Sequence, residues 1–290
     1  MKKKQATSAG KIAFALGQRG VYDIWSVDAT GENPSCLVHN SVWNDYPRWS
    51  PSGTELMFSS NMEGAFGIYK LNLNSRELKP VHVSHTWDGT ANWSPDGTSV
   101  VFASRRTGNC NLWFIKPEGE RFEQLTFDCY VDYDPVFSPN GEHIAFISNR
   151  SGSEEIWLLE FPSLRMRKLT ELKRRCFSPA WSPNGEQIAF ISASKQDGYQ
   201  VRMLNWKTGE SNVISIGPTR KRSLCWSPDG SYILFSGMDG QAVSFDLWLT
   251  SVQERMDRKL LHHPLIPKRN HKIVGRLDKY HPNWVGQEHD

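Results

Sequence analysis

A short phrase, an aromatic residue followed by Ser-Pro-x-Gly, recurs along the chain at a nearly constant interval. Its full copies are residues 49–53, 93–97, 137–141, 181–185 and 226–230, and a degenerate sixth copy begins at Trp284. The leading aromatics of the full copies lie 44 or 45 residues apart. A fixed period of about 20–50 residues is typical of repeat architectures, in which each repeat is one supersecondary unit. We therefore predict that the 290 residues form a single repeat domain.

Each repeat has the pattern of four short strands. In the repeat that contains Phe137, we expect strands at 135–138, 143–148, 154–159 and 167–170, because these segments are rich in apolar and β-branched residues. The Ser-Pro-x-Gly phrase separates the first strand from the second. Proline fixes φ, and Asn or Asp followed by Gly accepts positive φ, so the phrase predicts a tight hairpin turn.

The spacing of the strands predicts a closed ring of six blades. The N-terminal segment supplies only the second, third and fourth strands of a blade, at 12–16, 22–27 and 35–39, and the C-terminal segment supplies one first strand, at 282–285. Joining the two completes an all-β, six-bladed propeller of four-stranded antiparallel blades, without open edges at the chain ends. The expected boundaries are a tail at 1–10, one propeller domain at 11–286 with blades 282–285 plus 11–40, 44–84, 88–128, 132–172, 176–217 and 221–262, an insertion at 263–281, and a tail at 287–290.

The composition is that of a soluble globular protein with an ample core. The net charge is only +3, and no apolar run approaches the ~20 residues that span a bilayer. The 12 Trp, 14 Phe and 8 Tyr residues recur mostly at repeat positions, which favours core positions over a stacking surface. The five cysteines show no CxxC spacing, which disfavours a disulfide framework or a zinc site. No apolar segment follows residues 1–4, so we expect a cytoplasmic protein, or a periplasmic or secreted one if the chain is a mature or trimmed form.

The repeats resemble those of the TolB-like propeller family, which also occur in prolyl-oligopeptidase-type and tricorn-type peptidases. The resemblance is carried by tandem Trp-Ser-Pro-Asp-Gly units, as at 93–97, and by Ser-x-Arg-x-Gly hairpins, as at 148–152. It covers residues 11–286 and implies a propeller that takes partner segments at the mouth of its channel. Only ten residues precede the first predicted strand, so neither the α/β domain of TolB proteins nor a hydrolase domain is expected.

Variation between the repeats is concentrated on one face, which we call the entrance face. It carries the turns between second and third strands and the crossovers into the next blade, and loops on a rigid scaffold usually carry function. Residues four or five places before each leading aromatic are expected to line the channel mouth there, acidic or polar on three adjacent blades and basic on the next three. Such a mouth has an electrostatic field across the channel, which suits a ligand or peptide with separated charges. The alternative interpretation is that these residues are ordinary loop charges, many of them paired with each other across blade junctions. These candidate binding residues, close neighbours of the four-or-five-place positions included, are Asn44, Asp45, Asp88, Asp132 and Asp134, and, on the other side, Arg174, Arg175, Lys221, Arg222, Lys279, Tyr280 and His281.

The insertion before the last strand strengthens the basic side. Between Ser251 and Tyr280 there are eight Lys or Arg residues against three acidic residues. We expect a lid or a partner-docking arm over the mouth; the alternative is a tolerated surface loop. No aromatic residues interleave the basic run as nucleic-acid stacking requires, so no nucleic-acid partner is predicted. The candidate residues of the insertion are Lys268, Arg269, Lys272 and Arg276.

The sequence contains no catalytic motif of the G-x-S-x-G, H-E-x-x-H or phosphate-binding glycine type. We therefore assign no catalytic residue, no cofactor and no resident metal. Asp45, Asp88 and Asp132 could share a calcium ion at the mouth, although neighbouring Arg and Lys residues disfavour a cation there. We predict a monomeric, non-enzymatic propeller that binds a protein or peptide and does not insert into membranes. The alternative is a carbohydrate-active or small-ligand enzyme, a lyase or hydrolase of acidic sugars, with its site in the central channel.

Overall fold

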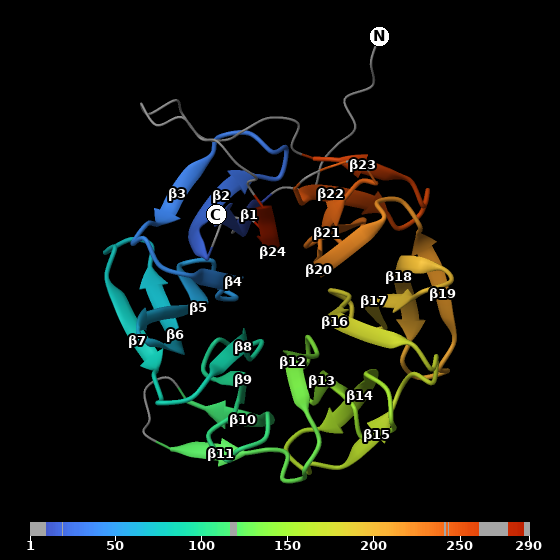
Figure 1. The fold of residues 1–290 in the computed structure, drawn as a ribbon, viewed down its shortest axis with the longest axis horizontal. Helices are drawn as coiled ribbons and strands as arrows, with labels where there is room; N and C mark the ends of the chain where they lie inside the picture. Colours follow the sequence, from blue (N-terminus) through green and yellow to red (C-terminus); the bar gives the residue numbers. More distant parts are fainter. Residues whose placement is uncertain are drawn as a thin grey trace.

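The structure, a computed structural model, describes residues 10–18, 20–116, 121–240, 242, 244–260 and 278–286. Six four-stranded antiparallel sheets are arranged around a central axis (Figure 1). The predicted all-β, six-bladed propeller is therefore confirmed. No helix among the residues in these ranges is long and apolar enough to cross a membrane.

Each blade runs from an innermost strand beside the axis to an outermost strand at the rim (Figure 1). The first two blades consist of β24 (Asp278–Val285), β1 (Lys11–Gln18), β2 (Val21–Asp28) and β3 (Ser35–Val38), and of β4 (Asn44–Trp49), β5 (Glu55–Glu63), β6 (Ala65–Asn72) and β7 (Leu78–His82). The next two consist of β8 (Asp88–Trp93), β9 (Val100–Ser104), β10 (Asn111–Ile115) and β11 (Phe122–Gln124), and of β12 (Asp132–Phe137), β13 (His143–Ser148), β14 (Glu155–Glu160) and β15 (Met166–Lys168). The last two consist of β16 (Arg175–Trp181), β17 (Gln187–Ser194), β18 (Gly198–Asn205) and β19 (Ser211–Ser215), and of β20 (Arg220–Trp226), β21 (Tyr232–Met238), β22 (Asp246–Ser251) and β23 (Asp257–Lys259).

The ring is closed by β24, which pairs with β1 although the two strands lie at opposite ends of the chain. Trp284 is opposite Ile12 and Lys279 is opposite Leu16 in this antiparallel ladder. This is the predicted closure. The strand begins at Asp278, four residues before the predicted start, because the innermost strands extend past a bulge toward the entrance face.

The innermost strands of blades two to six each contain one residue at positive φ, which is uncommon outside glycine. In β12 this residue is Asp134, with φ of 50°, and the pairing register shifts between Tyr133 and Val136. The bulge explains why the prolines at 47, 135 and 179 are tolerated in strands, because a bulge interrupts the hydrogen-bond ladder. The bulge residues are Tyr46, Thr90, Asp134, Ser178 and Ser223.

The core lies between neighbouring blades and is built from two aromatic series. The leading aromatics of the repeated phrase are 6–8% exposed, as predicted for core residues. A second series on the second strands, which the sequence analysis did not single out, is more deeply buried, with exposures of at most 1%. Its members are Phe14, Phe58, Phe102, Phe146, Phe190 and Phe235.

Three of the leading tryptophans, Trp93, Trp181 and Trp226, also tie their blade to the one before it. The indole Nε1 of Trp93 donates a hydrogen bond to the Arg48 carbonyl oxygen at 3.3 Å, and Trp226 donates in the same way to Ala180 at 3.0 Å. Phe137 occupies the corresponding position in the fourth blade and has no such donor. Thus the phrase that sets the repeat also supplies a hydrogen bond across several of the blade junctions.

Candidate functional site

Two cavities lie on the propeller axis, with a constriction of about 20 Å³ between them. The larger, which we call the entrance cavity, has a volume of about 730 Å³. It is lined by residues from the starts of the innermost strands β4, β12, β16 and β20 and from the starts of the third strands β2, β6 and β18. These segments belong to the predicted entrance face, so the cavity lies where functional residues were expected.

Aromatic side chains form much of the entrance cavity's wall. Trp43 is 37% exposed, and its ring centroid lies 5.1 Å from that of Tyr22 and 5.9 Å from that of Phe66. We predicted that the recurring aromatics favour core positions; eight aromatic side chains line this cavity as well, and one of them, Tyr22, also belongs to the buried core. The eight are Tyr22, Trp43, Tyr46, Phe66, Trp87, Tyr133, Phe177 and Tyr199. Trp43 and Trp87 both lie six residues before a leading aromatic, and Tyr133 and Phe177 both lie four before one, so this recurrence was the available signal for these four.

Charged side chains of opposite sign lie on different blades around this wall. Asp45 on the second blade and Asp134 on the fourth line it, as do Arg175 on the fifth and Lys221 and Arg222 on the sixth. The structure thus brings five of the predicted mouth residues together in one cavity. The acidic and basic sides lie in the predicted order around the ring.

Three other predicted mouth residues do not line the entrance cavity: Asn44, Asp88 and Asp132 are fully buried in the blades. Successive side chains of a regular strand point in opposite directions, and accordingly Asn44 is buried whereas its neighbour Asp45 lines the cavity. The Nδ2 of Asn44 donates to the Tyr22 carbonyl oxygen of the previous blade at 2.8 Å. Their role is therefore structural, as the alternative reading of paired loop charges proposed.

Asp88 and Asp132 form buried ion pairs with arginines of the Ser-x-Arg-x-Gly hairpins. The Nη2 of Arg150 lies 2.8 Å from Oδ2 of Asp132, and the Nη2 of Arg106 lies 3.5 Å from Oδ1 of Asp88. The three carboxylates of the suggested calcium site consequently do not converge. Among the described residues, no group of three His, Cys, Asp or Glu side chains could hold a metal ion.

The remaining predicted residues lie elsewhere. Arg174 pairs with Asp197 at 2.8 Å and does not line the cavity. Lys279 and Tyr280 lie on β24 opposite Leu16 and Ala15, and the side chains of residues 278–281, His281 included, lie outside the part that the structure describes. The insertion residues also lie outside it: Lys268, Arg269, Lys272 and Arg276.

The bulges aim further residues at the cavity that sequence reasoning did not find. Tyr46, Ser178 and Ser223 are at positive φ and line the wall together with Asp134. Bulges re-aim a side chain relative to a regular strand and are enriched next to functional sites. A proline directly after the bulge, as Pro47 and Pro179 show, was the sequence signal for two of these positions.

A polar cluster holds the basic side of the cavity in place. Glu154 accepts hydrogen bonds from the Tyr133 hydroxyl at 2.8 Å and from Nε of Arg175 at 2.5 Å. Burial and the neighbouring carboxylates raise the pKa of Tyr133, so its hydroxyl remains a donor at neutral pH. The Arg175 side chain is 60% exposed and lies over the Phe177 ring at 5.2 Å. It therefore presents a positioned guanidinium at the cavity.

Lys221 is an unusual member of the wall because its side chain is fully buried. Its Nζ donates hydrogen bonds to the carbonyl oxygens of Pro218 at 2.8 Å and Tyr199 at 3.0 Å. Burial lowers its pKa to about 8, and Asp257 opposes this shift. Lys221 occupies the repeat position of Asp88 and Asp132, and its bond to Tyr199 joins the sixth blade to the fifth.

Replacing Lys221 by Met is expected to change the pH dependence of stability. The folded-state pKa of about 8 lies below the ordinary value of 10.5, so between these values the unfolded chain binds the extra proton. The destabilising effect of the buried charge is fully present below pH 8 and is relieved as pH rises to 10.5. We expect the free energy of unfolding of the wild type to gain roughly 3 kcal/mol relative to Lys221→Met across this window.

Urea unfolding of both proteins at several pH values measures this gain. Lys195→Gln, which removes an exposed lysine, is the matched control and is expected to follow the wild type. A constant difference between wild type and Lys221→Met across the window would show that Lys221 titrates normally.

The fold and this cavity define a class of protein: a six-bladed propeller with an axial cavity that opens on the entrance face. Residues 72–265 match the family model of the TolB β-propeller domain. The match covers more than half of the sequence, so the chain belongs to the TolB β-propeller family. No sequence among curated proteins matches the chain.

Solved structures show the same fold. TolB from Acinetobacter baumannii superposes with a TM-score of 0.85 at 21% identity, over 96% of this chain and 67% of that chain. An oligogalacturonate lyase in complex with manganese has a TM-score of 0.63 at 16% identity, over 88% of this chain and 74% of the lyase. A nidogen–laminin complex contains a propeller with a TM-score of 0.70 at 11% identity, over 92% of this chain and 98% of that chain. At these identities the similarity concerns the fold alone, because one fold hosts many functions.

Proposed function

We propose that this protein is a non-enzymatic scaffold that binds a peptide segment of another protein in the entrance cavity. The lining of the cavity carries the proposal: eight aromatic side chains line it together with carboxylates from the second and fourth blades and cations from the fifth and sixth. Aromatic rings supply large contact areas at low conformational cost, and opposed charges fix the orientation of a ligand. The complementary ligand is a segment with an apolar or aromatic residue between a basic and an acidic residue.

The size of the cavity supports a segment rather than a folded domain as the ligand. Its volume of about 730 Å³ lies within the range of sites that enclose a drug-sized molecule. A few side chains fit this space, and the rest of the partner would lie across the entrance face. The insertion would then act as a docking arm that contacts the rest of the partner through its basic residues, Lys268, Arg269, Lys272 and Arg276.

Similar propellers support protein binding in general terms. A chain of a nidogen–laminin complex superposes on 92% of this chain. TolB from Acinetobacter baumannii covers 96% of the chain. These similarities support a binding scaffold in general terms. The aromatic and charged lining of the entrance cavity supports a peptide segment as its ligand.

Selection from a displayed random-peptide library on the purified protein tests the proposal. We expect enriched sequences that carry an acidic and a basic residue around an apolar or aromatic one. Binding of a selected peptide, followed by fluorescence polarisation, is expected to weaken at least about tenfold in the variant Arg175→Glu plus Arg222→Glu. It is also expected to weaken in Trp43→Ala, because the exposed indole is then missing from the wall.

The matched control reverses two exposed charges away from the cavity, in Arg165→Glu plus Lys207→Glu. This variant is expected to bind the selected peptides like the wild type. Equal affinity of the wild type and the cavity variants, or a library that yields no enriched sequence, would count against a peptide site in the cavity.

A second candidate is an enzyme acting on acidic sugars in the same cavity. The observation that favours it is the pairing of aromatic rings with Arg175 and Arg222, since rings stack on sugars and guanidinium groups bind carboxylates. The fold is shared with an oligogalacturonate lyase in complex with manganese. Incubation with oligogalacturonates, with and without manganese, separates the two candidates: new unsaturated or hydrolysed products support the enzyme, and intact substrate in both conditions refutes it.

A further inference from the structure

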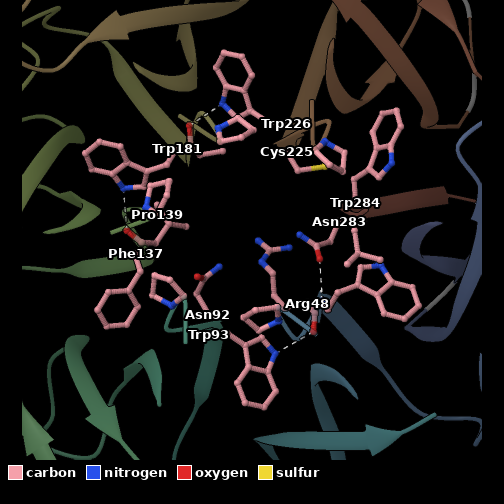
Figure 2. Close-up of a pocket in the computed structure, with 18 of the residues that line it drawn as sticks. Arg48, Asn92, Trp93, Phe137, Pro139, Trp181, Cys225, Trp226, Asn283 and Trp284 are labelled. Atoms are coloured by element: carbon pink, nitrogen blue, oxygen red, sulfur yellow. Dashed lines mark hydrogen bonds between the residues drawn. The ribbon is translucent and has the colours of Figure 1, made fainter. Parts of the chain in front are cut away.

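The second axial cavity lies on the opposite face, inside the ring of Ser-Pro-x-Gly turns, and has a volume of about 360 Å³ (Figure 2). We call it the far cavity. It shares no lining residue with the entrance cavity among the residues described. It is therefore a separate space, and the peptide-binding proposal does not involve it.

The walls of the far cavity differ in chemistry from one side to the other. The residue directly before each leading aromatic lines the cavity, and on three successive blades this residue is Asn283, Arg48 and Asn92. On the other three blades it is Val136, Ala180 and Cys225. Figure 2 shows the Arg48, Asn92 and Asn283 side chains directed into the same space. One half of the ring is thus polar and cationic, and the other half is apolar.

Arg48 forms no ion pair within the described residues, although Asp134 and Asp45 act on it electrostatically from farther away. Its guanidinium makes one hydrogen bond, from Nη1 to the Pro47 carbonyl oxygen at 3.1 Å, although an arginine has five N–H donors. None of the described carboxylates lies within ion-pair distance of it. Burial lowers its pKa, which reflects the unfavourable environment for a charge.

The Cys225 thiol does not serve as a counterion either. Burial raises its pKa to about 12, so the thiol is neutral although it lies near Arg48. A buried charge without a partner is costly, and such charges are normally paired or bound to a ligand. The geometry of the far cavity thus leaves room for an anion beside Arg48.

The two asparagines add donors on the same side. The Oδ1 of Asn283 accepts a hydrogen bond from the Trp49 backbone N–H at 2.9 Å, which leaves its Nδ2 for another acceptor. The Asn92 amide lines the cavity without a hydrogen-bond partner among the described residues. A guanidinium with neighbouring amide N–H groups matches the planar, two-oxygen geometry of a carboxylate.

We propose that the far cavity binds a monocarboxylate with an apolar body. The carboxylate lies against Arg48, Asn92 and Asn283, and the body lies against the apolar half formed by Val136, Ala180 and Cys225. The ligand is either a free organic acid or the carboxyl end of a peptide that closes with an apolar residue. Both offer the same chemistry, an anion joined directly to an apolar group.

Isothermal titration calorimetry of the full-length protein with benzoate, and with its neutral analogue benzamide, tests the site. We expect saturable binding of benzoate and none of benzamide. A peptide ending in a free Phe carboxylate and the same peptide amidated at its end distinguish the two sources: binding of the free-ended peptide only identifies a chain end, and binding of benzoate only identifies a small acid. If neither benzoate nor the peptide with the free carboxylate binds, the proposal is overturned. It is also overturned if chloride binds as tightly as benzoate.

Two variants locate the site. Arg48→Gln is expected to lower the affinity for benzoate on the order of ten- to a hundredfold, because a charge-assisted hydrogen bond is lost. Asn283→Asp keeps the acceptor for the Trp49 N–H and places a carboxylate in the far cavity. It is expected to abolish benzoate binding and to raise the melting temperature of the ligand-free protein, because Arg48 gains a permanent counterion.

Lys195→Gln removes one exposed positive charge and is the control for a general charge effect; it is expected to bind benzoate like the wild type. Melting curves of all variants show that they fold. Wild-type affinity for benzoate in folded Arg48→Gln, or in folded Asn283→Asp, would place the carboxylate elsewhere and overturn the assignment.

Discussion

Removal of residues 279–290 is expected to open the ring and lower the melting temperature by roughly 10 °C or more. The deletion takes almost all of β24 from the ladder that it forms with β1. It also removes Trp284, which is 7% exposed, and the bond from the Trp49 N–H to Asn283. The loss of one buried aromatic alone costs about 3–5 kcal/mol, and the unpaired edge of β1 adds to it.

Differential scanning calorimetry of the wild type and of two truncations measures this effect. A chain ending after Gly286 retains β24 and is the matched control, expected to melt with the wild type. If the longer deletion melted at the same temperature as the control, β24 would not be what closes the ring.

Arg150→Leu is expected to lower the free energy of unfolding by about 3–5 kcal/mol, because it leaves a buried carboxylate without its cation. Asp132 is fully buried, and the Nη2 of Arg150 lies 2.8 Å from its Oδ2. Arg150 also lies over the Trp157 ring at 5.1 Å, so packing contributes to the loss. Urea unfolding at neutral pH measures it.

The pH dependence of this loss identifies its cause. Burial raises the pKa of Asp132 even with Arg150 present, and removal of the cation raises it further. A protonated carboxyl needs no cation, so the deficit of Arg150→Leu is expected to narrow as pH falls through the acidic range. The double variant Asp132→Asn plus Arg150→Leu is expected to be more stable than Arg150→Leu alone. A deficit that is the same at all pH values would assign the effect to packing against Trp157.

The closed ring could be predicted from the sequence because it follows from the spacing of the repeated phrase. A constant interval fixes the number of blades, and the unaccompanied strand around Trp284 has only one place in a closed ring. The ends of the innermost strands could not be predicted as well. Pro135 suggested a strand start, whereas β12 begins at Asp132 and accommodates the proline through the bulge at Asp134.

The sequence predicted the face on which the cavity lies, but it predicted only some of the residues that line the cavity. The order of charges around the mouth placed Asp45, Asp134 and Arg175 correctly at the cavity. Asp88 and Asp132 belong to the same pattern in the sequence but point between blades, and nothing in the pattern separates the two orientations without the bulge. The aromatic wall was missed because recurrence marks every repeated position, whether buried or facing the axis.

The environment of Arg48 could not be predicted from the sequence, for a different reason. Its position before the leading aromatic is visible in the sequence, but a cation there is unremarkable until its surroundings are known. Only the packed ring shows that the side chains beside it in the far cavity are amides and apolar groups, and that Asp134 and Asp45 form no ion pair with it. The far cavity therefore depends on information that arises when distant repeats meet.

The pairing of β24 with β1 also bears on how the molecule is made. Among the described strands, β1 leaves the ribosome first during synthesis, and the strand that lies between it and the axis, β24, leaves last. Domains generally fold as units once their chain is available, and contacts between distant segments form slowly. The oldest blade of the nascent chain is consequently the last to be completed, and until then the β1 edge stays available to other strands.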